Sequence, residues 1–346
     1  MLELATRSPE RDDFMRALVY MGPGRMELQD APDPEPGLGE VTIAARASAI
    51  CGSDLHGFRE ASPRRIPPLI MGHETVGQIV EIGDGVPGSR LGERVVLKPI
   101  ASCGSCEWCV QGAINHCATG RLVGRDLSGG FAELFVVPAE AAVRLDADVT
   151  DQVATLTEPI ANAVHVVSRS VAKGDRVFVI GAGPIGVLMA KTALLEGAAS
   201  ALITDPMPGR LRLAEAQGAE AVTGDDPAAA VIDATDGGAD VVIDAAGYEA
   251  TWAMGLRAVR TAGRICEVGL GAGSGTLDFF AVLGKEVTIT GSYAWGEDDF
   301  SRAMALVSQG AFDFTDWITT MPLAEGQRAF EELTGGTDRF KVVLVP

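Results

Sequence analysis

The 346-residue chain lacks several features that would each define a broad class of protein. It has no uninterrupted apolar run of the roughly eighteen residues that a membrane-spanning helix needs. Its start, MLELATRSPERDDF, is charged throughout and contains no apolar segment of the signal-peptide kind. It also contains no internal repeat, heptad pattern or low-complexity tract. We therefore expect a soluble protein of the cytoplasm that binds no membrane.

Positive charge is scarce as well. The chain has 28 lysines and arginines against 47 aspartates and glutamates, which gives a formal net charge of −19. An acidic surface repels phosphate backbones and anionic lipid, which argues against nucleic-acid and membrane partners. Neutral or cationic small molecules remain compatible with it. The length and a hydrophobic content of 47% allow two domains with substantial cores.

The pattern of apolar residues changes near residue 150. Before it, short runs such as VTIAARA and FAELFVV alternate with turn residues, which predicts a mostly β region from about residue 16. After it, apolar strands alternate with helical stretches, from RVFVIG to VTITGSY. This alternation predicts a parallel sheet with crossover helices. Two further helices and a last strand, KVVLVP, are predicted beyond about residue 300.

A glycine-rich turn follows the first strand of the second region, in the segment VFVIGAGPIG. Gly181 permits a tight turn, Gly183 lets the backbone approach a pyrophosphate, and Gly186 lets the next helix pack closely on the strand. Asp205 ends the next strand, where its carboxylate is expected to bind the ribose hydroxyls of a dinucleotide. It would repel the extra phosphate of NADP, so we expect NAD, although Arg210 could partly offset the repulsion.

Residues suited to zinc are scattered through the first region. Cys51 lies in ICGSDLH, His73 and Glu74 lie in MGHETVGQ, and Glu158 lies in TEPIAN. A catalytic zinc needs three protein ligands and one open position. Cys51 and His73 would supply two ligands, and either glutamate would supply the third. On these residues alone, the choice between Glu74 and Glu158 stays open.

Four of the six cysteines are bunched in CGSCEWCVQGAINHC. Closely spaced cysteines on a glycine-containing loop can wrap one metal ion, whereas disulfides between such near neighbours would close only small loops and stabilise little. Four thiolates leave no open coordination position for a substrate. We therefore predict a structural zinc in a lobe spanning 98–121, with ligands Cys103, Cys106, Cys109 and Cys117.

These motifs together resemble the zinc-containing medium-chain alcohol dehydrogenase family. The segment from Gly72 to Val86 matches the pattern GHE-x-x-G-x5-G-x-x-V, and CGSD, GGFAE and GAGPIG occur in the order that this family shows. Glu158 followed by Pro159 resembles the polyol (sorbitol) and threonine dehydrogenase branch. The resemblance implies an α/β fold in which a GroES-like β-rich catalytic domain accompanies a Rossmann domain with a doubly wound parallel sheet.

The domain limits expected on this basis are an N-terminal extension at 1–15, a catalytic domain formed by 16–164 and 300–346, and an NAD-binding domain at 165–299. The resemblance implies hydride transfer to NAD from a secondary alcohol, such as a polyol, sugar, cyclitol or aminocyclitol and aminoglycoside hydroxyl. Threonine and simple secondary alcohols are alternatives. It also implies two zinc ions per chain, one catalytic and one structural, and a homo-oligomer, either a tetramer or a dimer.

The resemblance further assigns roles to single residues. Cys51, His73 and Glu74 would bind the catalytic zinc directly, with Glu158 close by. Ser53 and His56 would relay the alcohol proton to solvent. The residues expected to line the substrate pocket are Phe58, Asn162 and Trp295. The residues expected to bind the cofactor are Gly181, Gly183, Pro184, Ile185, Gly186, Asp205, Arg210, Gly247, Val268, Gly269, Ser292 and Tyr293.

Some of these roles have structural alternatives. Trp295 could stack on a sugar ring or could serve packing alone. The acidic run at 297–299 could attract an amine, but it fits better as the start of a helix. Two other classes of function are disfavoured. A non-catalytic NAD-binding paralogue would have lost Cys51, His73 or Ser53, and a nucleic-acid-binding zinc ribbon would carry cations around its cysteines.

Overall fold

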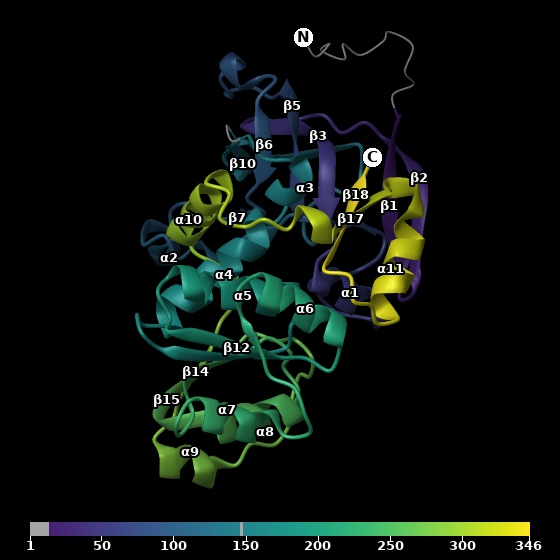
Figure 1. The fold of residues 1–346 in the computed structure, drawn as a ribbon. Helices are drawn as coiled ribbons and strands as arrows, with labels where there is room; N and C mark the ends of the chain where they lie inside the picture. The colour runs from purple at the N-terminus through teal and green to yellow at the C-terminus, as the bar shows by residue number, and fades with distance from the viewer. Residues whose placement is uncertain (1–13, 146–147) are drawn as a thin grey trace.

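The structure, a computed structural model, describes residues 14–145 and 148–346 (Figure 1). One half is rich in antiparallel strands, and the other is built on a parallel sheet. The two-part α/β architecture predicted from the sequence is confirmed. Among the described residues, no helix has both the length and the apolar character that crossing a membrane requires. The expected extension at 1–15 lies outside the described residues, except that Phe14 and Met15 already belong to the first strand.

The antiparallel half is organised around strand β3, which pairs with β5, β9 and β18. Strand β18 comes from the end of the chain and pairs in parallel with β17, so the chain leaves this half and later returns to it. The strands of this sheet are β3 (Glu40–Ala49), β5 (Glu74–Ile82), β6 (Arg94–Leu97), β9 (Leu134–Pro138), β10 (Ala142–Arg144), β17 (Ile318–Pro322) and β18 (Lys341–Val345).

Smaller elements surround this sheet. A three-stranded sheet has the order β2-β1-β4, and β7 pairs with β8 at the base of the cysteine-containing lobe. These strands are β1 (Phe14–Gly22), β2 (Arg25–Pro32), β4 (Leu69–Ile70), β7 (Ile100–Ala101) and β8 (Arg121–Leu122). The helices of this half are α1 (Gly52–Arg59), α2 (Glu107–Val110), α3 (Asp151–Ala154) and α11 (Gly326–Thr334).

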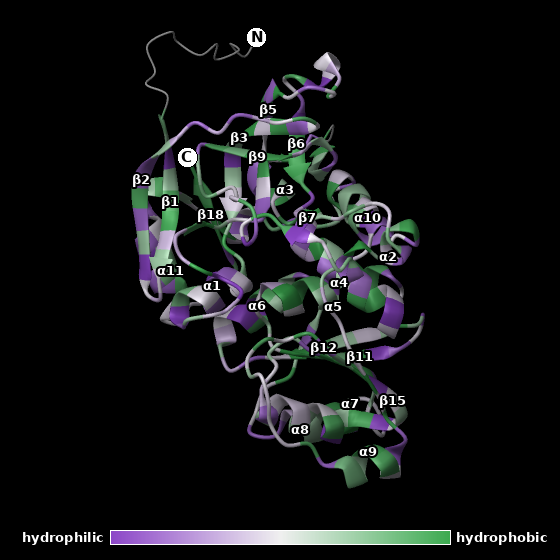
Figure 2. Cartoon of the chain, turned by 180° about the vertical axis from the view of Figure 1, so that it is seen from behind, coloured by the Kyte–Doolittle hydropathy of each residue, from purple (hydrophilic) through white to green (hydrophobic). Residues whose placement is uncertain are grey.

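The parallel half contains a six-stranded sheet with the order β13-β12-β11-β14-β15-β16. The chain enters at β11, winds outward to β13, and crosses back to continue from β14 to β16, which is the doubly wound arrangement. Its strands are β11 (Arg176–Ile180), β12 (Ser200–Thr204), β13 (Glu220–Ala221), β14 (Ala239–Asp244), β15 (Val259–Glu267) and β16 (Thr288–Gly291). Its helices are α5 (Pro184–Leu195), α6 (Pro208–Ala216), α7 (Pro227–Ala234), α8 (Glu249–Ala258) and α9 (Phe279–Lys285), the last of which is largely hydrophobic (Figure 2).

Two further helices, α4 (Thr157–Ser170) and α10 (Glu297–Ser308), pack against each other between the halves. Most residues of α4 are buried, and Nδ1 of His165 lies 2.7 Å from Oδ2 of Asp299. The domain limits expected between 164 and 165 and between 299 and 300 both fall inside these helices. Each helix is continuous across the expected limit, and the domain limits stay a prediction.

Candidate functional site

Three side chains of metal-binding type converge where β3 and β5 meet. Ala49 at the end of β3 pairs with Glu74 at the start of β5, which brings Cys51, two residues past β3, close to His73 and Glu74. The sulfur of Cys51, a ring nitrogen of His73 and a carboxylate oxygen of Glu74 all lie within 4.8 Å of one another. A thiolate, an imidazole and a carboxylate suit zinc, and three ligands leave a fourth position for a substrate.

Asp54 supports this group from α1. Its Oδ2 accepts a hydrogen bond from the backbone N–H of Cys51 at 3.1 Å, and its Oδ1 lies 3.7 Å from Nδ1 of His73. An imidazole whose Nδ1 faces a carboxylate presents Nε2 to a metal ion. The buried Asp54 is itself paired with Arg65, whose Nη2 lies 2.9 Å from Oδ1. Neither residue was predicted, although Asp54 is the last residue of the CGSD motif.

Glu74 is joined to a buried lysine from the last strand. The Nζ of Lys341 lies 2.8 Å from one carboxylate oxygen of Glu74 and 2.6 Å from the other, and both side chains are almost completely buried. Burial lowers the pKa of Lys341, but the negative charges of Glu74 and Cys51 outweigh it, so the net shift is upward. Lys341 therefore stays protonated beside the metal-ligand group. Nothing in the sequence distinguished it from any other lysine at the start of a strand.

Glu158 lies near this group but outside it. The set of mutually close ligand atoms contains Glu74 and not Glu158. Instead, Oε1 of Glu158 accepts hydrogen bonds from the indole N–H of Trp295 at 2.9 Å and from Nδ2 of Asn162 at 3.0 Å. Between the two glutamates that the sequence left open, this geometry favours Glu74 as the direct ligand.

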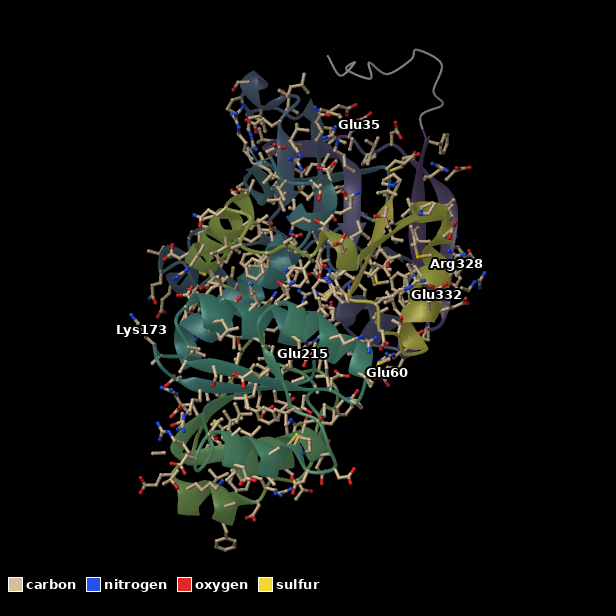
Figure 3. All side chains as sticks on the ribbon, in the orientation of Figure 1. Glu35, Glu60, Lys173, Glu215, Arg328 and Glu332 are labelled. Atoms are coloured by element: carbon tan, nitrogen blue, oxygen red, sulfur yellow. The ribbon has the colours of Figure 1, made fainter. Side chains whose placement is uncertain are left out.

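The two residues expected to relay a proton have different surroundings. Ser53 lies on α1, and its Oγ accepts a hydrogen bond from Nη2 of Arg65 at 2.9 Å. His56 is half exposed, and its Nδ1 lies 3.5 Å from a carboxylate oxygen of Glu60. Glu60, which is labelled in Figure 3, is exposed and directly follows α1. Within the described part of the chain, no hydrogen bond joins Ser53 to His56. The relay through Ser53 and His56 stays a prediction.

Two residues expected to line the substrate pocket are buried instead. Trp295 is completely buried, with its ring centroid 4.8 Å from that of Phe300. Phe58 is 4% exposed and packs on Phe330 at a centroid distance of 5.2 Å. Both rings pack among neighbouring side chains, and their place in the substrate pocket stays a prediction. Asn162 is partly buried beside Glu158 and keeps its position near the candidate metal centre.

The four clustered cysteines form a second candidate metal centre. Their sulfur atoms all lie within 4.8 Å of one another, and each cysteine is free of disulfides. Backbone N–H groups of Ser105 and Cys106, followed by the Ser105 hydroxyl, lower the pKa of Cys103 to about 5, which favours its thiolate. A tetrahedral four-thiolate zinc site fits this set of donors.

The cysteine lobe is fastened to the segment that precedes α10. The backbone N–H of Glu297 donates to the carbonyl of Gly112 at 2.8 Å, and Nδ2 of Asn115 donates to the carbonyl of Tyr293 at 2.9 Å. Nζ of Lys98 lies 2.6 Å from Oε1 of Glu297. These contacts hold the segment on both sides of Trp295. The acidic run at 297–299 opens α10, as the preferred alternative predicted.

The glycine turn has the geometry that a dinucleotide requires. Gly181 has a φ of +97°, a left-handed conformation that favours glycine. A Cβ on Gly186 would lie 1.8 Å from the carbonyl oxygen of Gly181, so only glycine lets α5 approach the turn this closely. A Cβ on Gly183 would meet nothing within 4 Å, which leaves open space beside its backbone. Pro184 and Ile185 open the first turn of α5; proline has no N–H, but that of Ile185 is free to receive a phosphate.

The carboxylate of Asp205 is held in place at the end of β12. Its Oδ2 accepts a hydrogen bond from the backbone N–H of Ala182 at 2.9 Å, and its Oδ1 accepts one from Met207 at 2.8 Å. Nη1 of Arg210 lies 3.5 Å from Oδ2. Asp205 thus lies directly against the glycine turn, and Arg210 partly neutralises it.

Most of the other residues expected to bind the cofactor gather at the same edge of the parallel sheet. The backbone N–H groups of Val268 and Gly269 donate to the carbonyl of Asp244 at 3.0 and 2.9 Å. Gly247 donates to Oδ1 of the same residue at 2.9 Å, and Ser292 donates to the carbonyl of Glu267 at 3.0 Å. Tyr293, which follows Ser292, is exposed. Asp244 and Glu267 were not predicted, although each ends a strand.

A doubly wound sheet with this turn, combined with a three-ligand metal centre, defines a metal-dependent dehydrogenase. Residues 37–147 match the alcohol dehydrogenase GroES-like domain, and residues 184–309 match the zinc-binding dehydrogenase family. The chain belongs to the zinc-containing medium-chain alcohol dehydrogenase family, in its polyol and threonine dehydrogenase branch. The family, the fold class and the enzyme class predicted from the sequence are confirmed.

Three similar proteins illustrate this membership. An L-threonine 3-dehydrogenase of Pyrococcus horikoshii is 38% identical over 88% of this chain and 90% of its own length. A sorbitol dehydrogenase of Halalkalibacterium halodurans is 33% identical over 96% of this chain and 99% of its own. The crystal structure of an alcohol dehydrogenase (rspB) from Escherichia coli CFT073 with NADH has a TM-score of 0.89 and 28% identity, and it covers 97% of this chain and 100% of that one.

Glu267, at the carboxyl edge of the parallel sheet, is expected to make the stability of the protein depend on pH. Burial and the neighbouring Asp244 raise the pKa of Glu267 from 4.5 to about 7. Between these two values the folded protein binds a proton here that the unfolded chain has released, so the free energy of unfolding falls as the pH rises. We expect Glu267→Gln to gain melting temperature relative to the natural chain between pH 5 and pH 8. The exposed Glu215→Gln is the control, and a difference that is constant with pH would contradict the assignment.

Proposed function

We propose that this enzyme uses zinc and NAD to oxidise a secondary alcohol of the polyol, sugar, cyclitol or aminocyclitol class. The observation that carries the proposal is the convergence of Cys51, His73 and Glu74 into a set of three metal ligands. Zinc held there would act as a Lewis acid that lowers the pKa of an alcohol, and NAD would accept the hydride. A second zinc held by the four clustered cysteines would stabilise the lobe.

The surrounding residues support this chemistry in distinct ways. Asp54 holds the imidazole of His73 in one orientation, and Lys341 holds the carboxylate of Glu74. Ser53 offers a hydroxyl on the helix that begins beside Cys51, and it would accept the proton that the alcohol loses. Asp205 accepts a hydrogen bond from the glycine turn, at the N–H of Ala182. Its charge repels an additional phosphate and so favours NAD over NADP. Six free cysteines suit the reducing conditions of the cytoplasm, which we propose as its location.

A second candidate substrate class is favoured by the comparisons. The 38% identity to a threonine dehydrogenase supports threonine, a β-hydroxy amino acid, as the alcohol. Both candidates need the same metal centre and the same hydride transfer, so they differ only in the pocket.

The substrate class can be tested by a panel. The purified protein, loaded with zinc, is assayed for reduction of NAD and NADP with polyols, cyclitols, amino sugars, threonine and simple secondary alcohols. We expect turnover with a cyclic or acyclic polyol-type alcohol, and a preference for NAD of at least about tenfold. Exclusive activity with threonine would select the second candidate. Failure with every alcohol, with two zinc ions bound per chain, would exclude an alcohol dehydrogenase.

The two metal centres predict opposite effects of cysteine replacement. Cys51→Ser is expected to lower kcat more than about a hundredfold with little change in melting temperature, because a catalytic metal contributes chemistry rather than folding. Cys106→Ser is expected to lower the melting temperature, because a structural zinc contributes to folding. Activity and thermal unfolding are measured on both variants. If Cys51→Ser unfolds the protein while Cys106→Ser only inactivates it, the roles of the two centres must be exchanged.

We also propose that the chain forms homo-oligomers through the edge of its parallel sheet. Strand β16 pairs only with β15 among the described strands, and all four of its residues are exposed. Beside it, α9 exposes Phe279, Phe280 and Leu283 at 69%, 89% and 69%. An unpaired edge beside an apolar patch is suited to pairing with the same edge of a second copy across a two-fold axis.

This interface predicts that Phe280→Asp reduces the mass seen in sedimentation at micromolar concentration, because it buries a charge against the partner. Leu38→Asp is the matched control, since Leu38 is 82% exposed in the other half of the molecule. An oligomer that survives Phe280→Asp but not Leu38→Asp would place the interface in the antiparallel half.

A further inference from the structure

Arg65 is a buried cation that no motif in the sequence singled out. It lies between α1 and β4, and its side chain is 6% exposed. Its position is shaped by Gly57 on α1, because a Cβ there would lie 2.5 Å from Cδ of Arg65. Burial of a cation is unfavourable unless its hydrogen-bond donors are satisfied, so its partners indicate its role.

The hydrogen-bond and ion-pair partners of Arg65 are Ser53 and Asp54, which follow Cys51, and Gly124, which packs against Gly72. Nε donates to the carbonyl of Ser53 at 3.1 Å, and Nη2 donates to the hydroxyl Oγ of the same residue at 2.9 Å. Nη2 also lies 2.9 Å from Oδ1 of Asp54, the carboxylate that faces His73. Nη1 donates to the carbonyl of Gly124 at 2.8 Å. The guanidinium therefore fixes Ser53 by its backbone and by its hydroxyl at once.

The bond to Oγ restricts what the Ser53 hydroxyl can do. A serine hydroxyl has one hydrogen to donate and two lone pairs to accept with. Because arginine stays protonated in proteins, Nη2 occupies one of these lone pairs permanently. One lone pair and one hydrogen remain. A proton that arrives at Oγ can then leave only as the hydrogen that Ser53 already carried.

We propose that Arg65 is a positioning residue for proton transfer. It holds the Ser53 hydroxyl so that the hydroxyl accepts one proton while it gives up another. The substrate hydroxyl loses its proton to the free lone pair of Oγ as the original hydrogen of Ser53 passes to a water molecule. The O–H bond of the alcohol breaks while a new O–H bond forms on Ser53, so Ser53 ends unchanged. The ion pair with Asp54 holds Arg65 close to the turn that carries Cys51. This inference rests on the proposed function.

Replacing Arg65 with lysine separates the effect of its several hydrogen bonds from the effect of its positive charge. Arg65→Lys keeps a cation beside Asp54 but cannot donate to both atoms of Ser53 and to Gly124 together. We expect kcat to fall about ten- to a hundredfold, the range expected for losing a hydrogen bond to a charged group, while KM for NAD and zinc content stay unchanged. The exposed neighbour Arg64→Lys is the matched control and should behave like the natural chain.

A double-mutant cycle identifies the route of the effect. If Arg65 acts through the hydroxyl, Arg65→Lys should change kcat no more than about twofold once Ser53→Ala has removed that hydroxyl. Equal losses in both backgrounds would overturn the proposal and leave Arg65 a purely structural residue. Should Arg65→Lys fail to fold, Gly57→Ala provides a second variant, because its methyl group displaces Cδ of Arg65 and removes no polar atom.

A binding measurement separates this inference from the proposed function. Trifluoroethanol serves as an alcohol probe that binds without rapid oxidation, and its affinity for the zinc-loaded protein with NAD is measured by titration. We expect Arg65→Lys to weaken it about tenfold because Ser53 no longer has a fixed orientation. If the natural chain binds the probe yet oxidises no alcohol, only the proposed function fails. Equal affinity in both proteins, or no binding in either, overturns the assignment of Arg65.

Discussion

The ion pair between Glu74 and Lys341 is the interaction on which the candidate catalytic centre depends most. It joins the start of β5, where Glu74 directly follows His73, to the last strand of the chain, and both side chains are almost completely buried. Loss of either partner of such a pair costs about 3–5 kcal/mol, because the other charge remains buried alone. The return of β17 and β18 to the first sheet is therefore a condition for the site and not only for the fold.

Helix α4 links this centre to the other half of the molecule. Its first turn carries Glu158, and its length packs on α5, which follows the glycine turn, and on α10. One rigid helix thus fixes the position of the metal centre relative to the dinucleotide edge. The same continuity means that the expected division of the chain at residue 164 falls within a helix that contacts both halves.

Local signals made part of the site predictable. The roles of Gly181 and Gly186 follow from backbone conformation and close approach, which spacing alone encodes, and the four clustered cysteines lie within one loop. Arg65 and Lys341 were missed because their partners are remote in sequence. The sequence around a single arginine or lysine does not indicate that the side chain is buried. The roles of Phe58 and Trp295 could not be decided from the sequence for a related reason: an aromatic side chain near a site is equally suited to a core.

The segment that carries Trp295 connects the cysteine lobe to the surroundings of the candidate catalytic centre. Its flanking residues are hydrogen-bonded to the lobe, and its indole N–H is hydrogen-bonded to Glu158. The lobe and this carboxylate are consequently connected by hydrogen bonds through one short segment. The cysteine lobe therefore also contributes to the position of a carboxylate beside the candidate metal centre.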